Sequence, residues 1–337
     1  HAEQAMAQVT ADTFPADWLP ISKMLDTATE QLGRAWGMVG HLQGVADTPE
    51  LRAAYNAELP RITDFFTRLG ANEALYAKYK AIQSSPLNAE QARAHTLALR
   101  NFVLSGAELQ GPAKERFAAI QERLAEISQL FSEHVLDATD AWSLLAAAED
   151  VSGIPEDVLQ AAQTAAKADG HSGYKLTLKM PCYLPVMQYA HSSSLREKLY
   201  RAHATRASAE FAHPQFDNSP LLQEILQLRQ EEAALLGYAN HAEVSLASKM
   251  AESPKQVMDF LRDLALRARP YAEKDLNEMR DFAAAEMGIT DPQPWDWTFI
   301  GEKLKEARYN FSEQEIKPYF TAPTVMAGLF KIVETLF

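Results

Sequence analysis

The feature that most constrains the fold is a helical repeat of apolar residues, which returns in one stretch after another. Between Gly111 and Thr139, apolar residues recur at steps of three and four: Phe117, Ile120, Leu124, Ile127, Phe131, Val135 and Ala138. This spacing places them on one face of a helix with 3.6 residues per turn. Asn88 with Gln91 forms a capping-box start of another helix, and Gly106 supplies its stop. The pattern predicts a mostly α fold.

The longest helix is predicted to begin at Ser253 and to end at Gly288. Pro254 stands at its first position, and Gln256 completes a capping box with Ser253. Pro270 lies inside it, where the missing N–H and the clash with the preceding turn predict a kink. Its apolar stripe comprises Val257, Phe260, Leu261, Leu264, Ala268, Leu276, Met279, Phe282 and Ala283.

One stretch, residues 174–180, alternates between polar and apolar side chains as a half-buried strand does, and Pro181 ends it. A lone strand needs a partner, and residues 142–147 are the best nearby candidate. The sequence therefore predicts one small antiparallel β ribbon, with a helix over residues 155–168 between its strands.

A turn-rich stretch over residues 211–218 suggests a boundary between two lobes. A chain of 337 residues exceeds the size at which single cores usually stop growing, about 250–300 residues. We expect an amino-terminal helical lobe over residues 1–214, which contains the ribbon, and a second helical segment over residues 215–337.

The net charge of the chain argues against two classes of binding partner. Thirty-two basic and 45 acidic side chains give a net charge of −13, which repels nucleic acid and anionic lipid surfaces. No apolar run approaches the ~20 residues that a membrane span requires. Cys182 is the single cysteine, so no internal disulfide can form. These features predict a cytoplasmic protein that binds neither nucleic acid nor membrane.

Both ends of the chain suggest a fragment of a longer protein. The chain opens at His1, without an initiator methionine and already within a helical composition. Residues 325–337 have apolar helical spacing but no stop signal. We expect further residues beyond Phe337.

The histidines do not have the spacing of a helical zinc site. No two of them are three or four residues apart, and the chain contains no HExxH motif. Distant histidines could still converge in space, although no spacing supports it. The histidine spacing therefore gives no support for a metal site within this chain. The nine histidines are His1, His41, His95, His134, His171, His191, His203, His213 and His241.

Two other features could support chemistry but have simpler explanations. His134, Asp137 and Asp140 share one side of a helix end and could form a proton relay or a metal half-site. Solvated or hydrogen-bonded side chains are the favoured interpretation. Cys182 could be a nucleophile, but no nucleophile motif surrounds it, so a packed thiol is favoured.

Three arginines follow one another at steps of five residues: Arg196, Arg201 and Arg206. Each step turns a helix by about 140° beyond a full turn, so the three do not share a face and a concerted carboxylate clamp is disfavoured. A single arginine could still hold a peptide carboxylate or a neighbouring helix end. Trp295 and Asp296 could line a substrate site, or pack beneath a loop.

A set of short segments follows in order along nearly the whole chain, at residues 102–109, 135–139, 183–187, 200–202, 205–208, 246–251, 268–270, 294–296 and 316–320. Taken together and in this order, they resemble landmarks of the thimet-oligopeptidase family of zinc metallopeptidases.

The resemblance implies a monomeric zinc endopeptidase of short peptides, a helical body split by a deep channel. It places one zinc ion on an HExxH helix and a downstream glutamate, which would lie beyond Phe337, so it implies no catalytic residue and no metal ligand within this chain. There, zinc would activate a water that the HExxH glutamate deprotonates. This chain would form one wall of the channel, inactive without its carboxyl-terminal half, with Arg206, Trp295 and Asp296 as candidate substrate-channel residues. The alternative is a non-catalytic helical peptide-binding module. An HExxH motif or a stop codon downstream of Phe337 in the reading frame distinguishes the two.

Overall fold

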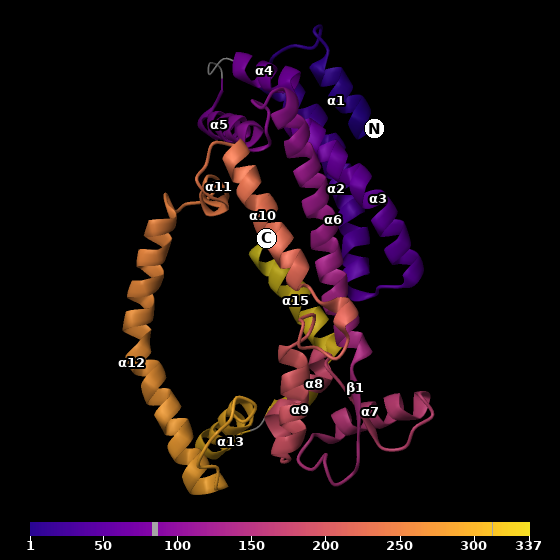
Figure 1. Cartoon of the computed structure of the whole chain (residues 1–337), viewed down its shortest axis with the longest axis vertical. Coiled ribbons are helices and arrows are strands. Elements are labelled where there is room, and N and C mark those ends of the chain that lie inside the picture. Colours follow the sequence, from indigo (N-terminus) through magenta and orange to yellow (C-terminus); the bar gives the residue numbers. More distant parts are fainter. Residues whose placement is uncertain (83–86, 312) are drawn as a thin grey trace. The chain divides into compact units, whose positions relative to one another are not determined.

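The computed structural model describes residues 1–82, 87–311 and 313–337. Helices make up most of the described chain (Figure 1). The one sheet among the described residues has two strands. The predicted mostly α fold with one small ribbon is confirmed. The chain divides into two compact units: residues 1–132 with 219–260, and residues 133–218 with 261–337.

Within the described residues, the first unit contains seven complete helices and parts of two longer ones. Its elements are α1 (Ala2–Thr10), α2 (Trp18–Val45), α3 (Pro49–Gly70), α4 (Glu73–Ala81), α5 (Ala89–Leu104), the first part of α6 (Gly111–Ala141), α10 (Ser219–Leu235), α11 (His241–Leu246) and the start of α12 (Pro254–Met287). One core cluster joins α1, α2, α4 and α5 around Val9, Ile21 and Leu75, all almost fully buried.

Helices α6 and α10 run side by side in the first unit (Figure 1). Ile120 and Ile127 of α6 are fully buried against Leu228 of α10. Two bidentate pairs flank this apolar seam: Arg116 with Glu231, and Arg123 with Glu224, at N–O distances between 2.6 and 2.8 Å. Apolar contacts therefore hold the two helices together, and the exposed ion pairs favour one register.

The second unit contains the ribbon and the helices around it. Its elements are the end of α6, β1 (Ser143–Ala146), α7 (Glu156–Ala168), β2 (Tyr174–Thr177), α8 (Met180–Tyr189), α9 (Ser193–Ala204), η1 (Pro214–Phe216), most of α12, α13 (Trp297–Tyr309), α14 (Glu313–Ile316), η2 (Lys317–Tyr319) and α15 (Ala322–Leu336). Its largest core cluster includes Leu176, Val186 and Leu199, which are fully buried.

The strands pair as the sequence predicts, antiparallel and with α7 between them. Ser143 lies opposite Thr177, and Ala146 lies opposite Tyr174. The second strand is shorter than the predicted range of 174–180, because α8 already begins at Met180 with Pro181 in its first turn. Proline is favoured there, so Pro181 starts a helix as well as ending the extended stretch.

The predicted helix ends are confirmed where caps mark them. Asn88 accepts from the backbone N–H of Gln91 at 2.8 Å, and the Gln91 side chain accepts from that of Asn88 at 3.1 Å. Gly106 has φ of +81°, the left-handed conformation of a helix stop. The long helix predicted over 253–288 is α12, and it continues through Pro270 without a break in the helix. The kink stays a prediction.

Most of the apolar stripe of α12 is exposed, whereas the apolar face of a packed helix is buried. Residues 261–271 are all exposed, with Leu264 at 52% and Phe260, just before them, at 65%. Ala283 is the buried residue of this helix. The periodicity thus predicts the helix, but among the described residues nothing covers most of its stripe.

The lobe boundary predicted after residue 214 stays a prediction. One crossing between the compact units falls nearby, between Asn218 and Ser219, and the others fall within α6 and α12. The sequence pattern did not indicate those two, because a helix that continues from one unit to the next has no turn signal.

Replacing Gly153 tests how closely the backbone packs at one point of the second unit. Its φ is +90°, and an added Cβ would lie 2.3 Å from the Tyr189 carbonyl oxygen and 2.7 Å from the His191 ring. We expect Gly153→Ala to lower the free energy of unfolding by about 2–4 kcal/mol, measured by denaturant unfolding. Gly170→Ala is the matched control, because Gly170 has φ of +77° but open space around it; we expect about 1–2 kcal/mol. Equal losses in the two variants would refute the steric argument.

Candidate functional site

The second unit contains a buried ion pair between α9 and the start of α13. Arg196 is 1% exposed and Asp296 is 4% exposed. Arg196 Nη2 donates to Asp296 Oδ1 at 2.5 Å, and Nη1 donates to the carbonyl oxygen of Ala190. The guanidinium also lies 4.2 Å from the centre of the Phe299 ring. These contacts hold a charge that would be costly to bury alone.

Asp296 is held by further donors from its own loop and from α9. Ser193 Oγ donates to Oδ1 at 3.0 Å, and the backbone N–H of Gln293 donates to Oδ2 at 3.0 Å. Ser193 in turn accepts from Trp295 Nε1 at 3.1 Å. The structure therefore brings the candidates Trp295 and Asp296 together with Arg196. Their channel role stays a prediction; the contacts described are internal to the unit.

Arg201 and Arg206 lie in separate surroundings from Arg196. Arg201 pairs with Glu197 at 2.8 Å and lies 5.2 Å from the Trp295 ring. Arg206 donates from Nε to the His203 carbonyl oxygen at 3.0 Å and from Nη1 to Thr139 Oγ1 at 2.9 Å. The three arginines do not converge, as their spacing indicates.

A second buried polar contact was missed by the sequence reasoning. Glu302 of α13 is 5% exposed and accepts from Tyr189 Oη of α8 at 3.0 Å, while Lys305 Nζ lies 2.8 Å from its carboxylate. Only the spacing of Glu302 and Lys305 within one helix could have been read from the sequence. The approach of α8 depends on the tertiary fold.

The polar end of α6 is hydrogen-bonded. His134 Nδ1 lies 2.8 Å from Asn218 Oδ1, and Asp140 lies 3.0 Å from Lys179 Nζ. The Cys182 thiol accepts from the Thr177 N–H at 3.3 Å and packs against the largest core cluster of this unit. Both arrangements match the simpler interpretations, which assign these side chains to the fold.

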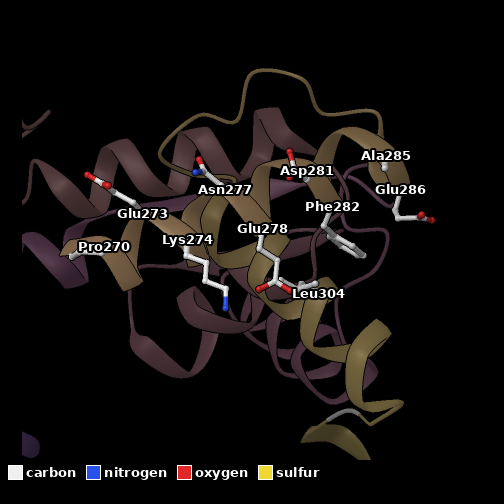
Figure 2. Close-up of a pocket in the computed structure, with 10 residues that line it drawn as sticks. All are labelled: Pro270, Glu273, Lys274, Asn277, Glu278, Asp281, Phe282, Ala285, Glu286 and Leu304. Carbon is white, nitrogen blue, oxygen red and sulfur yellow. The ribbon is translucent and has the colours of Figure 1, made fainter. Parts of the chain in front are cut away.

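A pocket of about 870 Å³ lies against α12 and α13 (Figure 2). Acidic side chains predominate on its wall, among them Glu273, Glu278 and Asp281, with one lysine, Lys274. Glu273 pairs with Arg269, and Glu278 with Arg308. The pocket offers oxygen atoms on one long helix but no convergent set of buried groups.

The described side chains contain no group of three or more His, Cys, Asp or Glu that could hold a metal ion. The residues of this part of the chain thus do not fit a zinc site. Over the same residues, no helix is both long enough and apolar enough to cross a membrane.

Two family models match the chain in sequence order. The amino-terminal domain of neurolysin and thimet oligopeptidase matches residues 1–114, and peptidase family M3 matches residues 186–337. Together with the helical fold, these matches define the class of protein as a largely helical member of a peptidase family. The chain belongs to peptidase family M3.

Individual relatives agree with this assignment. Oligopeptidase A of Salmonella typhimurium is 42% identical over 99% of this chain and 50% of its own length. Oligopeptidase A of Escherichia coli is 42% identical over 98% of this chain and 49% of its own length. A dipeptidyl carboxypeptidase of Salmonella typhimurium is 29% identical over 85% of this chain. The chain spans about half the length of the curated relatives it matches.

Proposed function

We propose that this chain is the amino-terminal, channel-wall portion of a zinc-dependent oligopeptidase that hydrolyses internal bonds of short peptides. The observation that supports it best is the 42% identity to two oligopeptidases A across 98% and 99% of this chain. Identity of this extent, in a chain about half as long as those relatives, fits one portion of a peptidase better than an unrelated helical module.

The proposal assigns zinc and the catalytic groups to residues outside this chain. A hydrolytic zinc site needs three protein ligands and an open position. The described residues offer no such grouping. We therefore propose that this chain alone is inactive, and that its partners are short peptides and a carboxyl-terminal catalytic half. We also propose that the parent protein is a monomer and that it lies in the cytoplasm.

The exposed apolar side chains of helix α15 support the proposal that another part of the protein packs against it. It has no buried residue, and Leu329, Phe330 and Leu336 are 51%, 59% and 71% exposed. A contiguous apolar surface of this kind is typical of an interface. We propose that the carboxyl-terminal half covers it.

If α15 is an uncovered interface, the isolated chain should self-associate. We expect light scattering at micromolar concentration to give an average mass above that of one chain, because apolar surface left in water favours association. Phe330→Glu should shift the mass toward the monomer. Glu334→Gln, on the same helix, is the matched control and should not. A monomer at all concentrations would contradict the prediction.

The function itself is tested by peptide cleavage. A quenched peptide of about ten residues should stay intact with this chain and zinc alone. Cleavage should appear when the chain is joined to the carboxyl-terminal half of an oligopeptidase A, which supplies the proposed zinc site.

A further inference from the structure

Arg206 is a half-buried cation without an acidic partner. Its two printed hydrogen bonds go to neutral oxygens, the His203 carbonyl and the Thr139 hydroxyl. No acidic side chain of the described chain forms an ion pair with it. A guanidinium has five N–H donors in a planar fork, so most of its donors remain for another acceptor.

Other arginines of the chain differ from Arg206 in this respect. Carboxylates raise the pKa values of Arg68, Arg116 and Arg123, each through a side-chain hydrogen bond. Burial instead lowers the pKa of Arg206. A partly desolvated charge that lacks a counter-charge is unfavourable, so a bound anion would be stabilising at this position.

Two aromatic side chains lie close to Arg206. Tyr183 of α8 and His203 of α9 stack with ring centres 4.0 Å apart and an angle of 12° between their planes. Burial and the nearby Arg206 lower the pKa of His203, which favours the neutral ring. Burial raises the pKa of Tyr183, so its hydroxyl stays protonated and can donate. The cluster therefore offers donors and a single positive charge.

We infer that Arg206, with Tyr183 beside it, binds the terminal carboxylate of a short peptide. The guanidinium fork matches a carboxylate in geometry and charge, and the stacked rings supply an apolar face for the last side chain. Partial burial strengthens the contact relative to an exposed arginine. The inference rests on the proposed function for the peptide, but the site itself rests on the contacts of Arg206.

The test uses the 337-residue chain and two labelled ten-residue peptides that differ only at the end, one a free carboxylate and the other an amide. We expect fluorescence anisotropy to show tighter binding of the free carboxylate by about tenfold or more. Arg206→Gln should remove this preference, and Arg206→Lys should retain part of it, because lysine keeps the charge but not the fork. Circular dichroism melting checks that each variant is folded.

Arg201→Gln is the matched control. Arg201 is an exposed arginine five residues before Arg206, already paired with Glu197, and its variant should keep the preference. Equal binding of both peptides, or a preference that survives Arg206→Gln, would overturn the site while leaving the proposed peptide function intact.

A third arm separates a failure of the site from a failure of the proposed function. Sodium acetate is titrated against the arginine side-chain resonances, with the Arg206 signal assigned by its loss in Arg206→Lys. If neither peptide binds but acetate shifts this signal, the carboxylate site is supported with a different source, and peptide binding fails. If acetate leaves the signal unchanged as well, the site is overturned.

Discussion

Replacing Asp296 with alanine is expected to lower the free energy of unfolding by about 3–5 kcal/mol. Arg196 would remain 1% exposed without its carboxylate, and a buried, uncompensated charge is far less stable than a paired one. The Ser193 hydroxyl and the Gln293 N–H would also lose their acceptor. Denaturant unfolding of the variant measures the loss.

Two companion variants separate burial of the charge from the pair itself. Arg201→Ala removes an arginine whose side chain is 66% exposed, and it should cost at most about 1 kcal/mol. The double replacement Arg196→Met with Asp296→Leu removes both charges and should recover most of the loss, because the uncompensated charge is gone. A loss under 1 kcal/mol for Asp296→Ala would show that the pair does not stabilise the unit.

Local patterns were enough to predict several of the helices and the ribbon. The capping box at Asn88 and the glycine stop at Gly106 involve only residues close in sequence, so the sequence alone is enough to predict them. The alternation around Leu176 likewise reports one buried face of a strand, and this residue is fully buried.

The polar contacts could not be predicted because they join distant residues. Arg196 and Asp296 are 100 positions apart, and no spacing rule links them. Tyr189 and Glu302 are 113 apart. Patterns along α9 showed that its arginines face different ways, but they gave no partner for any of them. Such contacts depend on how α13 packs on α8 and α9, which is a tertiary property.

The apolar stripe of α12 shows a different limit. The repeat of Phe260, Leu261 and Leu264 predicts a helix with an apolar face, and the helix forms. A pattern cannot specify what covers that face. In the described structure the side chains of Phe260, Leu261 and Leu264 are 65%, 49% and 52% exposed. Within the proposed function, the carboxyl-terminal half is the expected cover.

The largest expected effect concerns catalysis. With zinc present, this chain alone should cleave a quenched ten-residue peptide no faster than buffer, because the described residues contain no grouping of three metal ligands. The same chain joined in one reading frame to the carboxyl-terminal half of an oligopeptidase A should cleave it at least about a hundredfold faster, since enzymes commonly accelerate reactions by far more than this. Joining the halves avoids the aggregation that separate chains with exposed apolar surface would risk.

Three controls decide how the result is read. A chelator should abolish cleavage, and so should replacement of the HExxH glutamate of the added half by glutamine, because the general base is then missing. The added half alone should be slower than the joined protein if this chain forms a channel wall. Chelator-sensitive cleavage by residues 1–337 alone would place an active site in this chain, and its histidines would have to be tested as ligands. A joined protein that folds and binds zinc but cleaves nothing would favour the non-catalytic peptide-binding module, since the defect would then lie in how this half presents the peptide to an otherwise complete site.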